Sequence, residues 1–474
     1  MKTRDPAHVR RESSTQGVGT NGNVSFWFAA HGLPERRAAL STSIRADVCI
    51  VGAGLTGLWT AYYLKKAAPS WRVVVLEREF AGYGASGRNG GWLTNSIAGN
   101  PGALARRHGT DAVAALQHVM DASVDETIAV AAAEGIEADI VKGGTLQVAT
   151  TPAQLKRLHV EVENHRALGL GDFLMLDEAE AAERIRVDGM LGAYWNPQSA
   201  RVQPAKLVTG LARVVESLGV EIYESTPVSQ IATGAALTPA GSVRAPFVIR
   251  ATEGFTAEIP GLRRAWLPMN SSMVVTAPLP AEAWEEIGWR SFDTLGDEAH
   301  VFTYSQRTAD GRIAIGGRGV PYRFGSRTDN DGTTHRKTIE LLRESLHRYF
   351  PATRGVAIDH AWSGVLGVPR DWTATVGMDH RTGLGWAGGY VGHGVTTTNL
   401  AGRTLRDLVL ERNTAEVQLL WVSHQAPRWE PEPLRWIGVR SLYAAYTLAD
   451  RRESDGRPGT SRLAKVADRI SGRE

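Results

Sequence analysis

The sequence has little of several features that would restrict its function. Cys49 is the single cysteine among 474 residues, so neither an internal disulfide nor a cysteine-rich metal site can form. No stretch approaches the roughly 18–20 apolar residues that a membrane-spanning helix requires. The formal net charge is only +3, and no run of lysine and arginine suited to nucleic acid is present. We therefore predict no metal site, no nucleic-acid partner and no transmembrane segment, and the low cysteine use is compatible with a cytoplasmic location.

Apolar residues make up 43% of the chain and charged residues 22%, which is typical of a globular protein. The length exceeds that of one ordinary domain and is enough for a large core. Residues 1–24 are polar and have no apolar run behind the pair Arg10-Arg11. We expect a disordered leader there rather than a signal peptide.

The stretch after Ala46 has the parts of a dinucleotide-binding unit. They are, in order, a buried apolar run (Val48–Val51), a glycine cluster (Gly52-Ala53-Gly54-Leu55-Thr56-Gly57), a helical run (Leu58–Lys66), a second apolar run (Val73–Leu76) and an acid (Glu77). The glycines let a backbone approach a pyrophosphate at a helix N-terminus, and an acid about twenty residues further on suits an adenosine ribose. Strand, turn, helix and acid in this order make a chance glycine turn a poor explanation.

A second glycine-rich segment directly follows the acid, from Gly82 to Gly91. It also carries Ser86, Arg88 and Asn89, and such a loop brings backbone N–H groups close to a phosphate or a flat ring. A flexible surface loop is the alternative. A third turn, Gly392-His393-Gly394, leads into a helical run and offers a second helix N-terminus. Such a positive end would neutralise the electron-rich edge of a reduced flavin, which favours FAD over NAD.

The remaining pattern predicts two interleaved domains of an α/β protein, with an α+β substrate domain. We expect a single strand over residues 241–250 returning to the nucleotide domain, a turn over residues 194–197, and antiparallel strands around the Asp310-Gly311 turn. The predicted parts are a leader (1–24), a discontinuous Rossmann-like FAD-binding domain (25–100, 200–262 and 360–412), a helical segment (101–139), an antiparallel-sheet substrate domain (140–199 and 263–359) and a C-terminal helical extension (413–474).

The C-terminal extension is rich in tryptophan, proline and arginine, and residues 434–448 have an amphipathic pattern. Such a helix packs on the body of the protein or on a neighbouring subunit, or it makes a peripheral membrane contact. The sequence leaves these alternatives open, together with a possible homo-oligomer.

Four segments together carry a resemblance to a known family: DVCIVGAGLTGLWTAYYL, GASGRNGGW, ATEGF and GYVGHGVTTTNLAGR. They resemble the FAD-dependent D-amino-acid oxidase/glycine oxidase superfamily. The GASGRNGG loop and the tail RWEPEPLRWIGVRSLYAAYTLADRRE are similar to its γ-glutamylputrescine oxidoreductase-like branch. The resemblance extends from about Ser25 to the end of the chain.

The resemblance implies that FAD is bound by backbone at the glycines, by Glu77 at the ribose, by Arg78 and Val228 around the adenine, and by the turn around His393 at the pyrimidine edge. The implied cofactor-binding residues are Gly52, Gly54, Leu55, Thr56, Gly57, Glu77, Arg78, Gly84, Ala85, Ser86, Arg88, Asn89, Gly90, Gly91, Val228, Ala251, Thr252, Gly392, His393, Gly394, Val395 and Thr396. Some relatives link the flavin covalently through a histidine or cysteine that this sequence lacks at those positions, so the resemblance implies non-covalent FAD.

The implied reaction is oxidation of a C–N bond in a small amine or amino acid, by hydride transfer to flavin N5. The resulting imine hydrolyses to an aldehyde or keto acid, and the electrons pass to O2 or another acceptor. The candidate catalytic residues are an aromatic wall (Trp92, Tyr304 and Trp362), a histidine at the flavin (His393) and an arginine for an anionic group (Arg318). Core packing, for the aromatics, and a surface hairpin, for Arg318, are the alternatives.

No lysine lies between Lys206 and Lys337, the part of the chain that holds the predicted substrate-domain strands. Some relatives use a lysine above the flavin ring to activate oxygen. The choice between oxidase and dehydrogenase therefore stays open. Two other functions remain alternatives: an FAD monooxygenase that consumes NAD(P)H, and a flavin-binding protein without catalysis.

Overall fold

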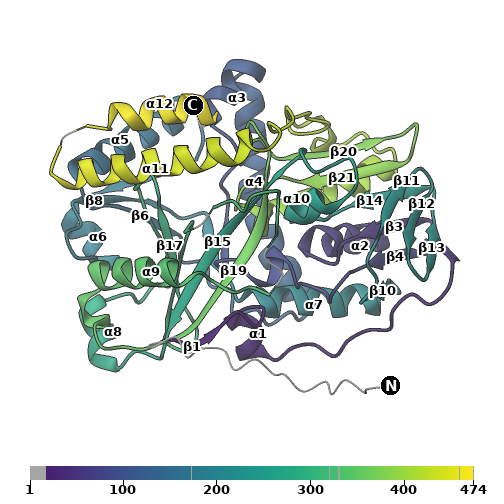
Figure 1. The fold of residues 1–474 in the computed structure, drawn as a ribbon, viewed down its shortest axis with the longest axis horizontal. Helices are drawn as coiled ribbons and strands as arrows, with labels where there is room; N and C mark the ends of the chain where they lie inside the picture. The colour runs from purple at the N-terminus through teal and green to yellow at the C-terminus, as the bar shows by residue number, and fades with distance from the viewer. Residues whose placement is uncertain (1–17, 172, 320, 329–330, 458, 473–474) are drawn as a thin grey trace, which may run out of the picture.

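The computed structural model describes residues 18–171, 173–319, 321–328, 331–457 and 459–472. A six-stranded sheet and a nine-stranded sheet dominate it and lie in the right and left halves of Figure 1. This mixed α/β architecture, with a parallel nucleotide-binding sheet beside a largely antiparallel one, confirms the predicted fold class.

The helices and strands have the following bounds. The helices are α1 (Phe26–His31), α2 (Leu55–Ala67), α3 (Pro101–His108), α4 (Thr110–Ala133), α5 (Pro152–Ala167), α6 (Glu178–Arg184), α7 (Pro204–Ser217), α8 (Ala281–Ile287), α9 (Arg336–Tyr349), α10 (Gly394–Val409), α11 (Leu434–Ser454) and α12 (Arg462–Ser471). The strands are β1 (Val18–Asn21), β2 (Ile44–Arg45), β3 (Val48–Val51), β4 (Val73–Leu76), β5 (Trp92–Thr94), β6 (Thr145–Ala149), β7 (Leu174–Leu176), β8 (Gly192–Asn196), β9 (Ser199–Arg201), β10 (Glu221–Tyr223), β11 (Gln230–Ala232), β12 (Ala235–Thr238), β13 (Gly241–Arg244), β14 (Phe247–Arg250), β15 (Leu267–Thr276), β16 (Thr294–Asp297), β17 (Thr303–Arg307), β18 (Ile313–Gly317), β19 (Ile358–Val368), β20 (Thr375–Asp379) and β21 (Leu384–Gly388).

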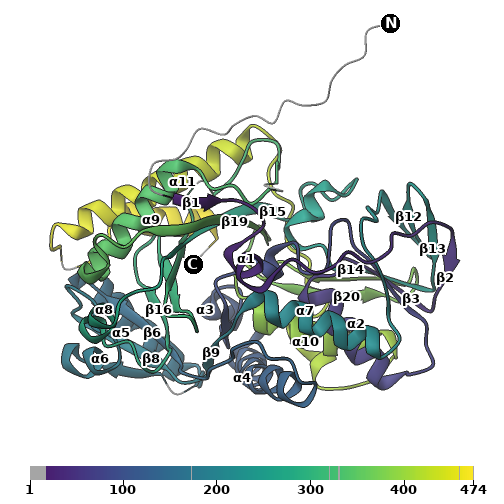
Figure 2. The same ribbon diagram turned by 90° about the horizontal axis from the view of Figure 1, so that it is seen from below.

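The six-stranded sheet has the order β10-β4-β3-β14-β21-β20, in which only β20 runs antiparallel to its neighbour. Every residue of β3 and β4 is buried. One face packs on α2, α7 and α10, and the small sheet β11-β12-β13-β2 covers the other (Figure 2). Burial on both faces explains why these two strands read as continuous apolar runs.

Helices α2 and α10 pack with their backbones unusually close. A Cβ atom added to Gly402 would lie 2.7 Å from the carbonyl carbon of Trp59. Since both helices begin beside the ends of the parallel strands, this contact holds their N-termini at the same edge of the sheet.

The predicted single strand over residues 241–250 is wrong. Gly241–Arg244 pairs within the small sheet, whereas Phe247–Arg250 pairs between β3 and β21 of the six-stranded sheet. Ala245 and Pro246 separate the two strands, because proline has no N–H for a sheet ladder and turns the chain from one sheet to the next.

The nine-stranded sheet has the order β1-β19-β15-β18-β17-β16-β6-β8-β7. The expected hairpin is present, with β17 and β18 pairing antiparallel across the Asp310-Gly311 turn. The turn predicted over residues 194–197 is wrong, since Gly192–Asn196 forms β8 and pairs with β6. Apolar side chains of α9 cover one face of this sheet, and the other face turns toward the nucleotide half.

The expectation of a disordered leader is wrong for residues 18–24, and residues 1–17 lie outside the described residues. Val18–Asn21 forms β1 at the edge of the nine-stranded sheet, with Val18 opposite Ile358. The side-chain amide of Asn21 also exchanges hydrogen bonds with the backbone of Thr334. A polar sequence conceals this strand because backbone pairing, not apolar burial, holds it in place.

The predicted domains remain a proposal, and the sheets suggest one change to them. Residue 360 lies inside β19, which belongs to the nine-stranded sheet along its whole length to Val368. We therefore propose that the last nucleotide segment begins after Val368. The C-terminal extension forms α11 and α12, which lie side by side along one edge of the molecule (Figure 1). None of the described helices is both long and apolar enough to cross a membrane.

Candidate active site

A cavity of about 540 Å³ lies between the carboxyl ends of the parallel strands and the inner face of the nine-stranded sheet. Val51, Glu77 and Thr252 line it from the ends of β3, β4 and β14, and Ser271 and Tyr304 line it from β15 and β17. The carboxyl end of a parallel sheet is where α/β proteins bind their ligands. The volume lies within the range of cofactor and ligand sites.

Two glycines make the first turn of the cavity possible. Gly52 has φ +111, and a Cβ atom there would lie 2.5 Å from the carbonyl oxygen of Ala251. A Cβ atom on Gly57 would lie 2.0 Å from the carbonyl oxygen of Gly52. Any larger residue would push the start of α2 away from β3. Because the N-cap residue Gly54 has no side chain, an anionic ligand can approach the N-terminus of α2 closely.

Glu77 follows β4 at the mouth of this turn. Its carboxylate accepts hydrogen bonds from the N–H of Ala53 at 2.8 Å and from the N–H of Glu79 at 3.0 Å. Burial raises the pKa of the carboxyl group, and these two hydrogen bonds act in the opposite direction. The residue thus lies next to the glycine turn, as the spacing predicted.

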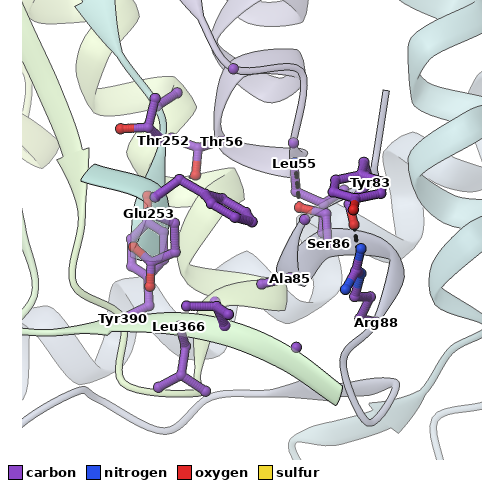
Figure 3. A pocket seen from close by; sticks show the side chains of 18 of the residues that line it. Leu55, Thr56, Tyr83, Ala85, Ser86, Arg88, Thr252, Glu253, Leu366 and Tyr390 are labelled. Carbon is purple, nitrogen blue, oxygen red and sulfur yellow. Dashed lines mark hydrogen bonds between the residues drawn. The ribbon is translucent and has the colours of Figure 1, made fainter. Parts of the chain in front are cut away.

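The glycine-rich loop lies against the start of α2. The Oγ of Ser86 accepts a hydrogen bond of 2.8 Å from the N–H of Leu55, and the Nε of Arg88 donates one of 2.8 Å to the carbonyl of Tyr83 (Figure 3). The loop therefore forms one wall of the cavity together with α2.

Successive carbonyl groups of this loop are bound by side chains from other parts of the protein. The donors for the carbonyls of residues 87 to 90 are Ser25 Oγ at 2.7 Å, Trp362 Nε1 at 2.9 Å, Trp27 Nε1 at 2.8 Å and Gln306 Nε2 at 2.7 Å. Because the carbonyls are held from outside, the loop keeps a defined shape without a ligand.

Trp362 was predicted as a wall of the substrate site, and the structure does not place it there. The side chain is fully buried and packs edge-on against Trp27, with ring centroids 5.7 Å apart. It supports the loop from behind by its hydrogen bond to Arg88. Gly364 and Leu366, on the same face of β19, do line the cavity, so Trp362 is excluded by its place further back along the strand, behind the loop.

The wall opposite the loop contains an acid that the sequence prediction missed. Glu253 has φ +42, and its carboxylate accepts hydrogen bonds from the N–H groups of Gly389 at 2.8 Å and Gly367 at 3.0 Å. Burial raises its pKa to about 7. Figure 3 shows Glu253 beside Tyr390 and Leu366, and the hydroxyl of Tyr390 lies 3.0 Å from Oγ1 of Thr56. Glu253 directly follows Ala251 and Thr252, which were predicted to bind FAD, and this position was the sequence signal that could have identified it.

The third turn lies at the far end of the cavity. His393 is the N-cap residue of α10, and its side chain makes no capping hydrogen bond to the helix. Burial, and then the nearby charge of Arg318, lowers the pKa of His393 to about 4. The imidazole is therefore neutral at pH 7.

Arg318 follows β18 and is only 6% exposed. Its Nη2 lies 3.4 Å from the carbonyl oxygen of Val391, while Nε and Nη1 are buried without a hydrogen-bond partner among the described residues. A buried cation with open donors is costly to the protein alone. The structure thus brings Arg318 into the cavity, where the surface-hairpin alternative would not have placed it.

Aromatic rings form the side of the cavity near Arg318. The rings of Trp92 and Tyr304 meet edge to face at 6.1 Å, and Phe302 lies beside them. The hydroxyl of Tyr304 lies 2.8 Å from Oγ of Ser271. Phe302 and Ser271 were not predicted, because nothing in a strand pattern tells which sheet face meets a cavity.

The cavity brings together most of the predicted site residues. Those that line it are Gly52, Gly54, Leu55, Thr56, Glu77, Arg78, Gly84, Ala85, Ser86, Arg88, Asn89, Gly90, Trp92, Val228, Ala251, Thr252, Tyr304, Arg318, Gly392, His393, Gly394 and Val395. Those that do not are Gly57, Gly91, Trp362 and Thr396. Gly57 acts through the packing described above, and Thr396 is buried in α10, whereas Thr398 on the same helix lines the cavity.

Fold and cavity together define an enzyme of the dinucleotide-binding class with a second, substrate-facing sheet. Residues 47–408 match the family model "DAO: FAD dependent oxidoreductase", and the chain belongs to this family. It is 31% identical over 421 residues to the gamma-glutamylputrescine oxidoreductase of Escherichia coli (strain K12), covering 87% of this chain and 94% of that protein. It is 27% identical to the glycine oxidase of Geobacillus kaustophilus (strain HTA426), over 78% of this chain and 94% of that one.

The fold comparison agrees with the sequence comparison. The crystal structure of glycine oxidase from Geobacillus kaustophilus superposes with a TM-score of 0.68 at 23% identity, covering 80% of this chain and 99% of that one. The crystal structure of L-proline dehydrogenase from P.horikoshii superposes with a TM-score of 0.66 at 20% identity, covering 81% and 96%.

The cofactor is therefore FAD, as predicted, and the cavity fits it. Two helix N-termini, the glycine turn that a Cβ would fill and the carboxylate of Glu77 provide the parts that an adenine dinucleotide requires. Non-covalent binding agrees with the position of Cys49, which is buried in β3.

Proposed function

We propose that this enzyme oxidises the C–N bond of a small amine or amino acid that carries an anionic group such as a carboxylate. The names of the relatives support the amine class. The observation that carries the anionic group is Arg318, whose buried Nε and Nη1 have no partner among the described residues. A carboxylate accepts from two guanidinium donors at once, which would satisfy them.

The residues near Arg318 would position the other end of the substrate. Trp92, Phe302 and Tyr304 exclude water and offer ring faces to an amine. With a carboxylate at Arg318, the carbon beside the nitrogen would lie between these rings and the turn at His393. Bound FAD would supply the redox chemistry by accepting a hydride, which carries both electrons, from that carbon.

His393 is a poor base for an ammonium group, because the pKa of its imidazole is lowered to about 4. We propose instead that the substrate binds as the neutral amine, and that neutral His393 and the N-terminus of α10 donate hydrogen bonds to developing negative charge. The imine product then hydrolyses in water to an aldehyde or a keto acid.

The acceptor of the electrons is O2 or another oxidant. No lysine is among the residues that line the cavity, so the oxygen-activating group of some relatives has no counterpart there. The match to an oxidoreductase family and its amine-oxidising relatives favour this function over the monooxygenase and the non-catalytic alternative.

The test is anaerobic reduction of the enzyme-bound flavin by a panel of amines with and without a carboxylate. Arg318→Met should lower kcat/KM for carboxylated amines about 100-fold, because a buried charge pair loses one partner. It should leave amines without a carboxylate nearly unchanged. The control Arg290→Met changes an exposed arginine outside the cavity and should have no effect.

Equal losses for both classes of amine would contradict the role of Arg318. Bleaching by NADPH without bleaching by any amine would overturn the proposed reaction in favour of the monooxygenase. Repeating the successful reaction in air with peroxide detection distinguishes O2 from another acceptor.

A further inference from the structure

The paired helices α11 and α12 have an inner face that the protein covers and an outer face that it leaves open. Tyr446 of α11 donates a hydrogen bond of 2.8 Å to Asp468 of α12, and Ala449 and Ala467 pack between the helices. The outer face carries large apolar side chains with high exposure: Leu434 at 60%, Ile437 at 49%, Leu448 at 42%, Val466 at 57% and Ile470 at 59%. These are nearly half of the exposed large hydrophobic residues in the described chain.

The apolar surface extends to the loop before α9. Phe324 is 52% exposed, and its ring lies 6.3 Å from that of Trp436 in an edge-to-face arrangement. Several exposed apolar side chains on two paired helices mark an interaction surface more readily than single solvent-facing residues do.

The charges on the two helices are segregated by sign. The exposed ionisable side chains of α11 and α12 are all cationic: Arg440, Arg451, Arg452, Arg462, Lys465 and Arg469. None of them forms an ion pair among the described residues. The exposed acid nearby is Asp455, which lies in the connecting turn together with Arg457.

The acidic residues of the same helices point inward and are bound. Asp450 accepts hydrogen bonds from the backbone of His300 and Val301 at 2.8 and 3.0 Å. Glu453 pairs with Arg157 at 2.8 Å and with His300 at 2.9 Å. The acids therefore anchor the helices to the protein, and the outer face keeps only positive charge.

We propose that the outer face of α11 and α12 docks on an anionic lipid surface. A helix with exposed apolar residues between arginine and lysine side chains lies in the plane of a bilayer interface, with the apolar groups among the lipids and the cations at the head groups. This arrangement requires no helix that spans the bilayer, and it is independent of the proposed reaction.

A second copy of the chain fits this face less well. In a twofold contact the same patch lies on both partners, so the cations of one copy would face the cations of the other. Such like-charge contacts oppose association. An anionic bilayer instead supplies the complementary charge together with an apolar phase.

The test is flotation of the full-length FAD-loaded enzyme with vesicles of phosphatidylcholine alone or with 30% phosphatidylglycerol. We expect binding to the anionic vesicles only, and weaker binding as salt is raised. The variant Val466→Glu/Ile470→Glu should reduce the bound fraction at least tenfold. The control Leu33→Glu, which changes a residue 56% exposed elsewhere on the surface, should bind like the wild type.

Flavin content and the reduction rate in solution establish that the variant is folded, because neither residue is among those that line the cavity. A second variant, Arg462→Gln/Lys465→Gln/Arg469→Gln, keeps the apolar residues and should lose the preference for anionic vesicles. Absence of binding to anionic vesicles would overturn the proposal. A dimer seen by light scattering that the Val466→Glu/Ile470→Glu variant abolishes would assign the face to a second copy instead.

Discussion

The two ends of the cavity differ in how their polar groups are satisfied. At the nucleotide end, the protein itself binds them: Glu77 accepts two backbone N–H groups, and Ser86 accepts the N–H of Leu55. At the other end, Nε and Nη1 of Arg318 are buried without a partner among the described residues. The first end is preformed, whereas the second is completed by what binds there.

This difference has a physical reason. The adenine nucleotide is the same in every catalytic cycle, so its site gains from rigidity. The substrate enters and leaves. Buried donors without a partner are costly, so a ligand that accepts their hydrogen bonds binds more tightly than one that does not. Changes at the nucleotide end should therefore affect cofactor content, and changes at the other end should affect turnover.

The largest effect is expected for Gly57→Ala. The added Cβ would lie 2.0 Å from the carbonyl oxygen of Gly52, so α2 must shift and the pyrophosphate site must open. We expect FAD binding about 100-fold weaker, since overpacking of this kind costs a few kcal/mol. The measurement is flavin absorbance after gel filtration.

Gly438→Ala is the matched control for that substitution. A Cβ atom at this position in α11 meets no heavy atom within 4 Å. This variant should retain its FAD and its stability. Normal FAD content in Gly57→Ala would show that the nucleotide end is not rigid.

A smaller effect is expected for His393→Gln at the other end. The amide keeps a hydrogen-bond donor but not its position, so kcat should fall about 10-fold while FAD content is unchanged. Because the pKa of His393 is about 4, its titration should not appear in the wild-type kcat profile between pH 5.5 and 8. A limb in that range that disappears in the variant would contradict a neutral His393.

Glu77→Gln tests the preformed end more gently. The amide oxygen accepts one of the two backbone hydrogen bonds, but the negative charge is lost. We expect the Kd for FAD to rise about 10-fold, with kcat of the FAD-saturated enzyme unchanged. The measurement is titration of the apoenzyme with FAD, with Glu282→Gln, an exposed acid of α8, as the control.

The smallest effect is expected for Glu253→Gln, and it depends on pH. Burial raises the pKa of Glu253 from 4.5 in the reference state to about 7 in the folded protein. Between these values the folded protein holds a proton that the unfolded chain has released, so the contribution of Glu253 to stability falls as pH rises through 7. Glutamine does not titrate, so any Tm advantage of the wild type over the variant should shrink between pH 5 and 8. A difference in Tm that is constant over this range would argue against the raised pKa.

Several elements could be predicted from the sequence because their signal is local. Val48–Val51 and Val73–Leu76 have the predicted bounds, since a strand buried on both faces shows an unbroken apolar run. Strand β1 could not be predicted, since backbone pairing with β19 leaves no mark on the side chains.

The aromatic candidates show where such local signals end. Trp92, Tyr304 and Trp362 were predicted together as an aromatic wall, yet only the first two line the cavity. Whether a residue of β19 meets the cavity or the back of the glycine-rich loop depends on tertiary packing, which involves residues far apart in the chain.

The sequence by itself determined the nucleotide end, because glycines and an acid at set spacings form that site from one continuous segment. Only the tertiary structure decided the other end. Arg318 follows β18 of the nine-stranded sheet, whereas His393 is the N-cap residue of α10. A Cβ atom on Gly392 would lie 3.8 Å from Nη2 of Arg318. Their proximity follows from long-range packing, which also buries the donors of Arg318 and keeps His393 neutral.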